Sequence, residues 1–131
     1  MNRQLKFRVW DKLAERMIYP HNDNQQHFII DLNGRFHNLQ NGSGGDDYVI
    51  QQYTGLTDNN DDPIYEGDIL KNHYDVSNNI IGQVLYESDH GGYIFQWKRR
   101  GQDYKITNLN CDVAFGSVIV GNIFEHSELL K

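Results

Sequence analysis

The sequence predicts an all-β protein made of short strands. Among its 131 residues are eight tyrosines, six phenylalanines and two tryptophans, together with 12 glycines. Aromatic side chains fit pleated, half-buried surfaces, and glycine is favoured in turns. Apolar and polar residues also alternate over several short segments, which is the pattern of a strand with one buried face. A chain of this length is expected to form one domain, to which a small lobe can be added.

The first strand is expected in "LKFRVWD". Its alternate residues form a buried face of Leu5, Phe7 and Val9 and a solvated face of Lys6, Arg8 and Trp10. The segment "DKLAERM" follows as a short connection to a second strand, and Asp11 is able to cap a turn in it. A single amphipathic helix over residues 11–17 is the alternative.

A β-hairpin is expected in "HFIIDLNGRFHNL". Asn33-Gly34 between apolar flanks predicts a two-residue type I′ turn, in which both central residues have positive φ. The next segment, "QNGSGGDD", contains only glycine and polar residues, which indicates a flexible linker. We therefore place an N-terminal β-rich lobe at residues 1–47 and the rest of the protein at residues 48–131.

Residues 48–131 contain several short apolar segments separated by turns. These segments are "YVIQQYTGL", "IYEGDILKNHY", "IIGQVLYES", "GGYIFQWKR", "YKITNL" and "VIVGNIF". Short strands with regular glycine breaks predict a small barrel or a sandwich. At the C-terminus, "EHSELLK" is expected to form one helical turn, with Ser127 as its N-cap and Glu128 near its positive end.

Five carboxylates lie close together in "TDNNDDPIYEGD" and raise the question of a metal site. Asp58, Asn60 and Asp62 have the first three spacings of a calcium-binding loop. Such a loop also needs a glycine and a glutamate at the positions where this chain has Pro63 and Ile69. We therefore expect no metal there. The segment is predicted to be a hairpin turn in which Asp and Asn side chains bond to their own backbone.

The segment "IYEGD" is expected to be structural. Gly67 is predicted to take a backbone conformation that other residues avoid, and Asp68 to accept hydrogen bonds from nearby amides. Its apolar neighbours are expected to enter the core: Ile64, Ile69 and Leu70. The alternative is a hydrolase that uses Glu66 or Asp68 as an acid or base.

The six histidines and the single cysteine form no catalytic or metal-binding pattern in the sequence. None of the histidines has the spacing H-x-H or H-E-x-x-H, which would place two imidazoles on one metal. His27 and His37 could approach each other across the hairpin, but two histidines without a third ligand make a weak site. Cys111 is expected to be a small buried apolar residue. We accordingly predict a non-enzymatic protein with no metal and no cofactor.

The candidate binding residues are Lys98, Arg99 and Arg100 in "WKRRGQDY". Basic residues beside Trp97 and Tyr104 can bind phosphates and stack on bases. Alternatively the segment is a hairpin tip, in which the cations keep the loop soluble or protect a sheet edge. Alternation favours the hairpin tip, because it groups three aromatic residues on one face typical of a core: Tyr93, Phe95 and Trp97.

The composition limits which binding partners and which cellular compartment are expected. The net charge is −6 and the pI is about 5.4, so the chain as a whole repels polyanions. We expect no appreciable binding to DNA at physiological salt. A single cysteine cannot form a disulfide within the chain, which suits a reducing cytosol. The sequence contains no pattern of a signal peptide or a membrane span.

Three blocks of the sequence resemble the YopX family of bacteriophage and prophage proteins. They are "FRVWDKLAERMIY", "QYTGLTDNNDDPIYEGDIL" and "IVGNIFEHSELL", and together they span nearly the whole chain. Where the family often has an Asn-Gly type turn before "IYEGD", this chain has the four residues "NDDP". The resemblance implies an SH3-like barrel in residues 48–131, a phage or prophage origin and a location in the cytoplasm of the bacterial host. It supplies no activity and no catalytic residues, because the function of the family is uncharacterised.

The leading hypothesis for function is a small non-enzymatic accessory protein that binds a protein partner or itself. The loops and edge strands of small β domains are suited to binding peptides, and pairing of edge strands gives oligomers. The alternative is a nucleic-acid-binding module that uses the loop of Lys98, Arg99 and Arg100. The salt dependence of DNA binding separates these hypotheses, because each phosphate contact adds about −0.9 to the log–log slope.

Overall fold

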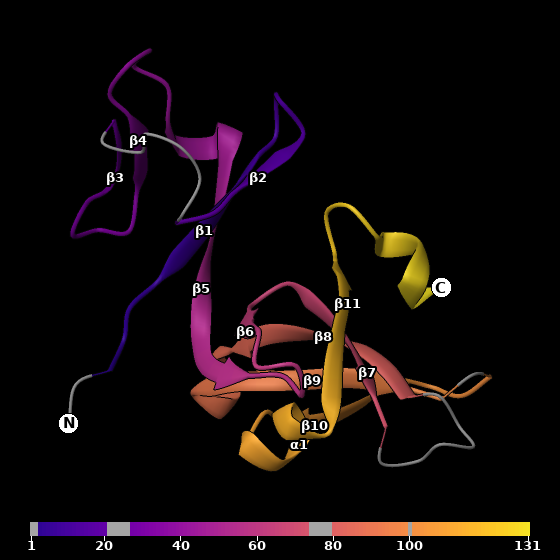
Figure 1. Ribbon diagram of the computed structural model, residues 1–131. Coiled ribbons are helices and arrows are strands. Elements are labelled where there is room, and N and C mark those ends of the chain that lie inside the picture. The colour runs from indigo at the N-terminus through magenta and orange to yellow at the C-terminus, as the bar shows by residue number, and fades with distance from the viewer. Residues whose placement is uncertain (1–2, 21–26, 74–79, 100) are drawn as a thin grey trace. The chain divides into compact units, whose positions relative to one another are not determined.

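The structure is a computed structural model that describes residues 3–20, 27–73, 80–99 and 101–131 (Figure 1). Half of the described residues lie in strands, which form three antiparallel sheets beside one short helix. The prediction of a mainly β protein is therefore confirmed.

By its internal contacts the chain divides into two compact units. The N-terminal unit is Leu5–Gln52, and the C-terminal unit contains Tyr53–Lys131. The strand β5 (Tyr48–Thr57) contributes its first part to one unit and its second part to the other. The division into residues 1–47 and 48–131 that the sequence suggests stays a prediction about domains.

The N-terminal unit contains four short strands besides its part of β5. They are β1 (Phe7–Asp11), β2 (Arg16–Ile18), β3 (Phe28–Ile30) and β4 (Phe36–Asn38). β1 pairs antiparallel with both β2 and β5, whereas β3 and β4 form a sheet of their own. The predicted order of strand, connection and strand at the start of the chain is confirmed, and the alternative helix is wrong. Asp11 caps the connection, since its Oδ1 accepts hydrogen bonds from the backbone N–H groups of Leu13 and Ala14.

The solvated face predicted for the first strand is wrong at Arg8. This side chain is 2% exposed, and its Nε donates a 2.6 Å hydrogen bond to Oε1 of Gln51. Gln51 lies directly opposite Arg8 in the pairing of β1 with β5. The two polar side chains therefore satisfy each other across the strands, which allows both to be buried.

The predicted hairpin of β3 and β4 is confirmed, but its predicted turn type is wrong. Gly34 has a φ of 79°, whereas Asn33 is not in the left-handed region. The Gly34 N–H donates to the Asp31 carbonyl at 2.9 Å, and the Asp31 N–H donates to the Arg35 carbonyl at 3.0 Å. The loop therefore has three residues instead of two, and only its last residue needs positive φ.

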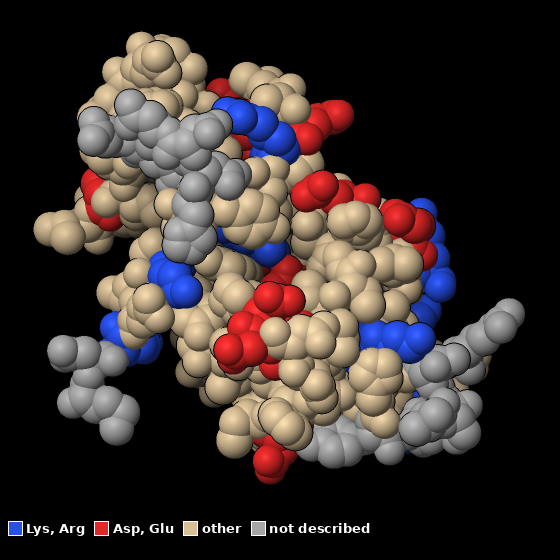
Figure 2. Space-filling view, viewed as in Figure 1, with Lys and Arg blue, Asp and Glu red and all other residues tan. Residues whose placement is uncertain are grey.

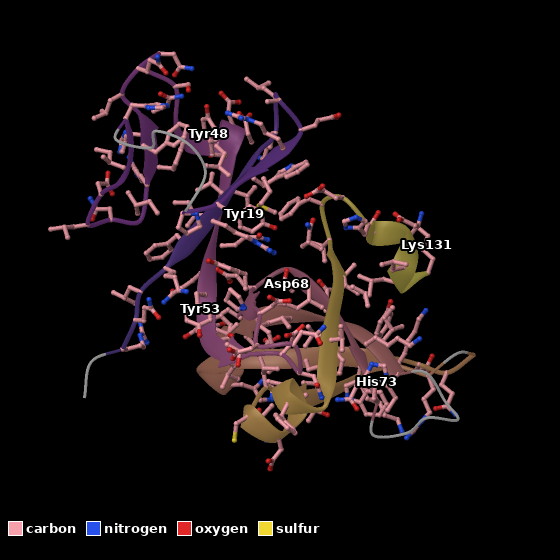
Figure 3. All side chains as sticks on the ribbon, in the orientation of Figure 1. Tyr19, Tyr48, Tyr53, Asp68, His73 and Lys131 are labelled. Atoms are coloured by element: carbon pink, nitrogen blue, oxygen red, sulfur yellow. The ribbon has the colours of Figure 1, made fainter. Side chains whose placement is uncertain are left out.

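The glycine-rich segment after β4 is hydrogen-bonded, although the sequence indicates a flexible linker. The Asn38 N–H donates to the Ser43 carbonyl at 2.8 Å, and the Gly42 N–H donates to the Asn38 carbonyl at 2.9 Å. The hydroxyls of Ser43 and Tyr48 (Figure 3) lie 2.8 Å apart. These bonds tie the segment to the end of β4 and to the start of β5.

The C-terminal unit is built on a five-stranded antiparallel sheet with the order β10-β9-β8-β7-β11. Its strands are β7 (Asp68–Asn72), β8 (Ile80–Glu87), β9 (Gly92–Lys98), β10 (Lys105–Asn108) and β11 (Ser117–Asn122). β6 (Pro63–Tyr65) pairs with the second part of β5. The sheet is curved into a half-barrel. The SH3-like barrel that the family resemblance implies is a more specific architecture. Its main core cluster consists of Ile64, Leu70, Ile80, Val84, Phe95 and Ala114.

Three short helical segments complete this unit, and the first of them is a 3-10 turn at Ser88–His90. The helix α1 (Cys111–Phe115) was not expected, because a five-residue helix is too short to show a periodic pattern. Cys111 stands at its exposed start, so the prediction of a buried cysteine is wrong. A 3-10 turn forms at Ser127–Leu130 as predicted, but its N-cap is His126 and no side chain caps it. None of the described helices is long and apolar enough to cross a membrane.

Candidate functional site

The acidic segment after β5 forms a turn around the buried side chain of Asp58. Its Oδ1 accepts hydrogen bonds from the backbone N–H groups of Asn60 and Asp62, each at 2.9 Å. Its Oδ2 accepts a 2.9 Å hydrogen bond from the N–H of Ile119 in β11. The predicted turn, in which aspartate bonds to its own backbone, is confirmed. Both oxygens of this carboxylate serve the fold.

The backbone conformation and the hydrogen bond predicted for the "EGD" segment are confirmed. Gly67 has a φ of 87°, a conformation that glycine adopts more easily than other residues. Asp68 (Figure 3) is 2% exposed, and its Oδ2 accepts a 2.8 Å hydrogen bond from the Tyr65 N–H. The neighbouring apolar residues are fully buried as predicted: Ile64, Ile69 and Leu70.

The two histidines of the hairpin, His27 and His37, each contact another side chain. Nε2 of His37 lies 2.9 Å from Oδ2 of Asp31, whereas the ring of His27 packs against Phe28. The pKa of Asp31 is lowered, mainly by the hydrogen bond to His37 and then by the backbone N–H of Arg35. Within the described ranges, no three side chains of His, Cys, Asp or Glu gather as metal ligands.

The predicted basic site lies at the end of the β9–β10 hairpin. Nζ of Lys98 is 4.9 Å from the ring centre of Tyr104. The Arg99 guanidinium and the Lys105 amine are 5.3 and 5.6 Å from the ring centre of Trp97. These contacts form a cluster of cations and aromatic rings that includes Lys105. The third predicted residue, Arg100, lies outside the described residues.

The aromatic rings of this cluster are largely committed to contacts within the protein. Nε1 of Trp97 donates a 2.7 Å hydrogen bond to Oγ1 of Thr107, and the ring packs against the core cluster. The hydroxyl of Tyr104 donates to the Leu130 carbonyl at 2.8 Å. A base that stacks on Trp97 would have to displace these cations or the core contacts, so the ring is a poor stacking platform.

The core face predicted for β9 is confirmed in part. Phe95 is 2% exposed and belongs to the core cluster, and Trp97 packs against that cluster. Tyr93 is half-buried and contacts Tyr86 edge-on, with 5.5 Å between the ring centres. Burial raises the pKa of Tyr93, and the nearby charge of Glu66 raises it further.

A second candidate surface, which the sequence does not reveal, is an apolar groove in the N-terminal unit. Its volume is about 360 Å³. It is lined by Leu5, Lys6, Phe7, Val9, Ile18, Tyr19, Pro20, Phe28, Ile29, Ile30 and Phe36. Ten of these eleven residues are apolar or aromatic, and Lys6 is the charged one.

The groove has a buried floor and an exposed rim. Its floor consists of the core residues of the unit, Val9, Ile18 and Phe36. Its rim includes Leu5 and Ile29, which are 58% and 42% exposed. The lining residues come from four strands and the segments beside them, so only the folded chain brings them together.

The described geometry defines a small mainly β protein with an apolar groove in one unit and a basic hairpin tip in the other. The family assignment agrees with the resemblance seen in the sequence. Residues 6–131 match the YopX protein family, so this chain belongs to that family. Its structure is similar to the crystal structure of protein EF1440 from Enterococcus faecalis, with 26% sequence identity and a TM-score of 0.62. The similarity covers 99% of this chain and 100% of that one. A search of curated proteins gave no match.

Proposed function

We propose that this YopX family protein is a non-enzymatic accessory protein of a phage or prophage. It binds a protein partner, or a second copy of itself, in the cytoplasm of the bacterial host. The observation that carries this proposal is the apolar groove of the N-terminal unit. A concave surface of about 360 Å³ with mostly apolar walls has the size and character of a binding site.

We also propose that the sheet of the C-terminal unit is the SH3-like barrel that the family resemblance implies. Support comes from the order of its strands: β7 to β10 follow one another as a meander, and β11 returns beside β7. A sheet whose last strand in the sequence pairs with its first strand can curl toward a barrel. The short helix α1 stands directly before that last strand.

The experiment that tests the binding function places a photo-crosslinking amino acid at Ile29, on the rim of the groove. A matched control places it at Leu13, which is 77% exposed in a turn of the same unit. We expect a discrete crosslinked species in host cells from position 29 and none from position 13. Light scattering of the purified protein shows whether the partner is a second copy. A monomer that yields no crosslink from position 29 would remove the proposal.

A second candidate function is nucleic-acid binding through Lys98, Arg99 and Arg100. The observation in its favour is the gathering of Lys98, Arg99 and Lys105 at one hairpin tip. On the face drawn in Figure 2, however, acidic residues lie among the described basic residues. Three phosphate contacts predict roughly a 40-fold loss of affinity between about 50 and about 200 mM salt. Micromolar DNA binding that disappears when the three charges are reversed would favour this function.

A further inference from the structure

We propose that the apolar groove binds an extended peptide segment of a partner protein, which adds as a strand to the outer edge of β3. The inference rests on the proposed function, because it names the surface and the partner chemistry of that binding role. Four features of the N-terminal unit support it: the course of the groove, the direction of the backbone groups in β3, the end of β2 and the chemistry of the lining.

The groove runs along strand edges and not over one face of a sheet. Successive side chains of a strand point to opposite faces. The groove is nevertheless lined by all three residues of β3, Phe28–Ile30, and by the consecutive residues 5–7, which lead into β1. A groove that touches residues of both faces has to pass the edge of the strand. Two strand edges therefore border one apolar groove.

The backbone of β3 is oriented for strand addition. Among the described strands, β3 pairs with β4 alone. The Asp31 N–H donates to the Arg35 carbonyl, so in this register the odd-numbered residues of β3 direct their polar groups toward β4. Phe28 and Ile30 consequently direct their N–H and C=O groups to the other side. An extended peptide adds to a strand through backbone groups that point outward in this way.

The pairing of β1 with β2 stops at the same groove. The Lys12 N–H donates to the Asp47 carbonyl, so the register turns the N–H and C=O groups of Phe7 toward the side of β2. β2 ends at Ile18, and the residue opposite Phe7 in this register is Pro20, which has no N–H. Proline thus ends the pairing of β2 with β1 beside the groove.

The lining defines the chemistry of the bound segment. A peptide strand directs alternate side chains into the groove, where the walls are Phe7, Phe28 and Ile30. Apolar residues at every second position of the peptide would cover these three side chains. The predicted partner segment is therefore extended and apolar at alternate positions.

A display library of random decapeptides, selected against the full chain, provides the probe. We expect enrichment of peptides with alternate apolar residues. The variant Ile29→Lys, which puts a charge on the rim of the groove, should weaken their binding by at least about tenfold. Leu13→Lys is the matched control, since it adds the same charge to an exposed leucine elsewhere in this unit and should not change the affinity.

A change in the peptide alone tests strand addition without any risk to the fold. Methylation of alternate backbone nitrogens on one edge of a selected peptide removes the donors that would pair with β3, and binding should be lost. Methylation on the other edge should be tolerated. Equal binding of both methylated peptides, or equal binding to the wild type and Ile29→Lys, would overturn the inference. If a crosslink from position 29 still captures a protein in that case, the proposed binding function stands. A dimer that Ile29→Lys breaks would assign the groove to a second copy and also overturn the inference.

Discussion

Two turns of this molecule, residues 31–35 and 58–62, have the same local structure in different surroundings. Each begins with an aspartate whose Oδ1 accepts hydrogen bonds from the backbone N–H groups two and four residues later, at 2.9 to 3.0 Å. In each, the fourth residue has positive φ, which is 79° at Gly34 and 65° at Asp61. The two sequences, "DLNGR" and "DNNDD", share only the aspartate and the asparagine.

The second carboxylate oxygen distinguishes the turns. Oδ2 of Asp31 is hydrogen-bonded to Nε2 of His37 within the same exposed hairpin. Oδ2 of Asp58 accepts a hydrogen bond from Ile119, in a strand far along the chain, and the Asp58 side chain is 3% exposed. The comparison shows that an aspartate can build a turn from local bonds alone. The same residue becomes a link between distant strands when its other oxygen is buried against one.

The largest expected effect is the loss of stability in Asp58→Ala. This change removes the acceptor of three backbone N–H groups, and hydrogen bonds to a charged group contribute about 1.5–3 kcal/mol each. We expect a loss of about 3 kcal/mol or more in the free energy of unfolding, measured by urea denaturation. Asp31→Ala is the matched control and should lower the stability much less, because water can reach the amides of that turn. Equal losses would contradict the distinction between the two turns.

Asp58→Asn divides that effect into its local and its distant part. The asparagine oxygen can still accept the two hydrogen bonds of the turn, whereas its amide nitrogen cannot accept from Ile119. The variant should therefore lose at least about 1 kcal/mol, through one unsatisfied buried donor, and remain more stable than Asp58→Ala. Hydrogen exchange of the Ile119 amide gives a direct measurement, and unchanged protection of that amide would argue against the link.

Substitutions at the fourth position of each turn should change the stability of the protein. Asp61→Gly relieves a left-handed conformation that costs residues other than glycine up to about 1–2 kcal/mol, so it should stabilise the protein by up to about 1 kcal/mol. Gly34→Asp should destabilise it by a similar amount. Thermal unfolding of both variants checks the prediction. Changes of the same sign in the two turns would mean that their backbones are not equivalent.

The smallest effect concerns the pH dependence of Asp31. Its pKa is lowered below the usual 3.8, so the folded state favours the charged form. The resulting stabilisation is present above pH 3.8 and is lost as the pH falls through the lowered pKa. The difference in Tm between the wild type and Asp31→Asn should therefore shrink at acid pH. His37→Gln should bring the pKa of Asp31, measured by NMR, closer to its usual value. An unchanged pKa of Asp31 in this variant would show that the hydrogen bond to His37 does not lower it.

Much of the fold follows from patterns that a sequence displays locally. The alternation in "YIFQW" predicts β9 and the burial of Phe95, and the glycine of "IYEGD" marks a backbone position with positive φ. Other features escape such patterns. The burial of Arg8 depends on a cross-strand partner, and the exposure of Cys111 depends on an unexpected turn of helix. In the basic site the sequence identifies Lys98 and Arg99 but not Lys105, which comes beside Trp97 only when β9 pairs with β10.

The sequence by itself determined where most of the strands and turns of this protein lie, because alternation, glycine and aspartate act within a few residues. The tertiary structure alone decided the partner of Asp58 and the existence of the groove. Leu5, Ile18 and Phe28 line one surface although they lie far apart in the chain, and no local pattern relates them. Their meeting depends on the packing of separate sheets, in which burial of apolar surface has no fixed direction along the sequence.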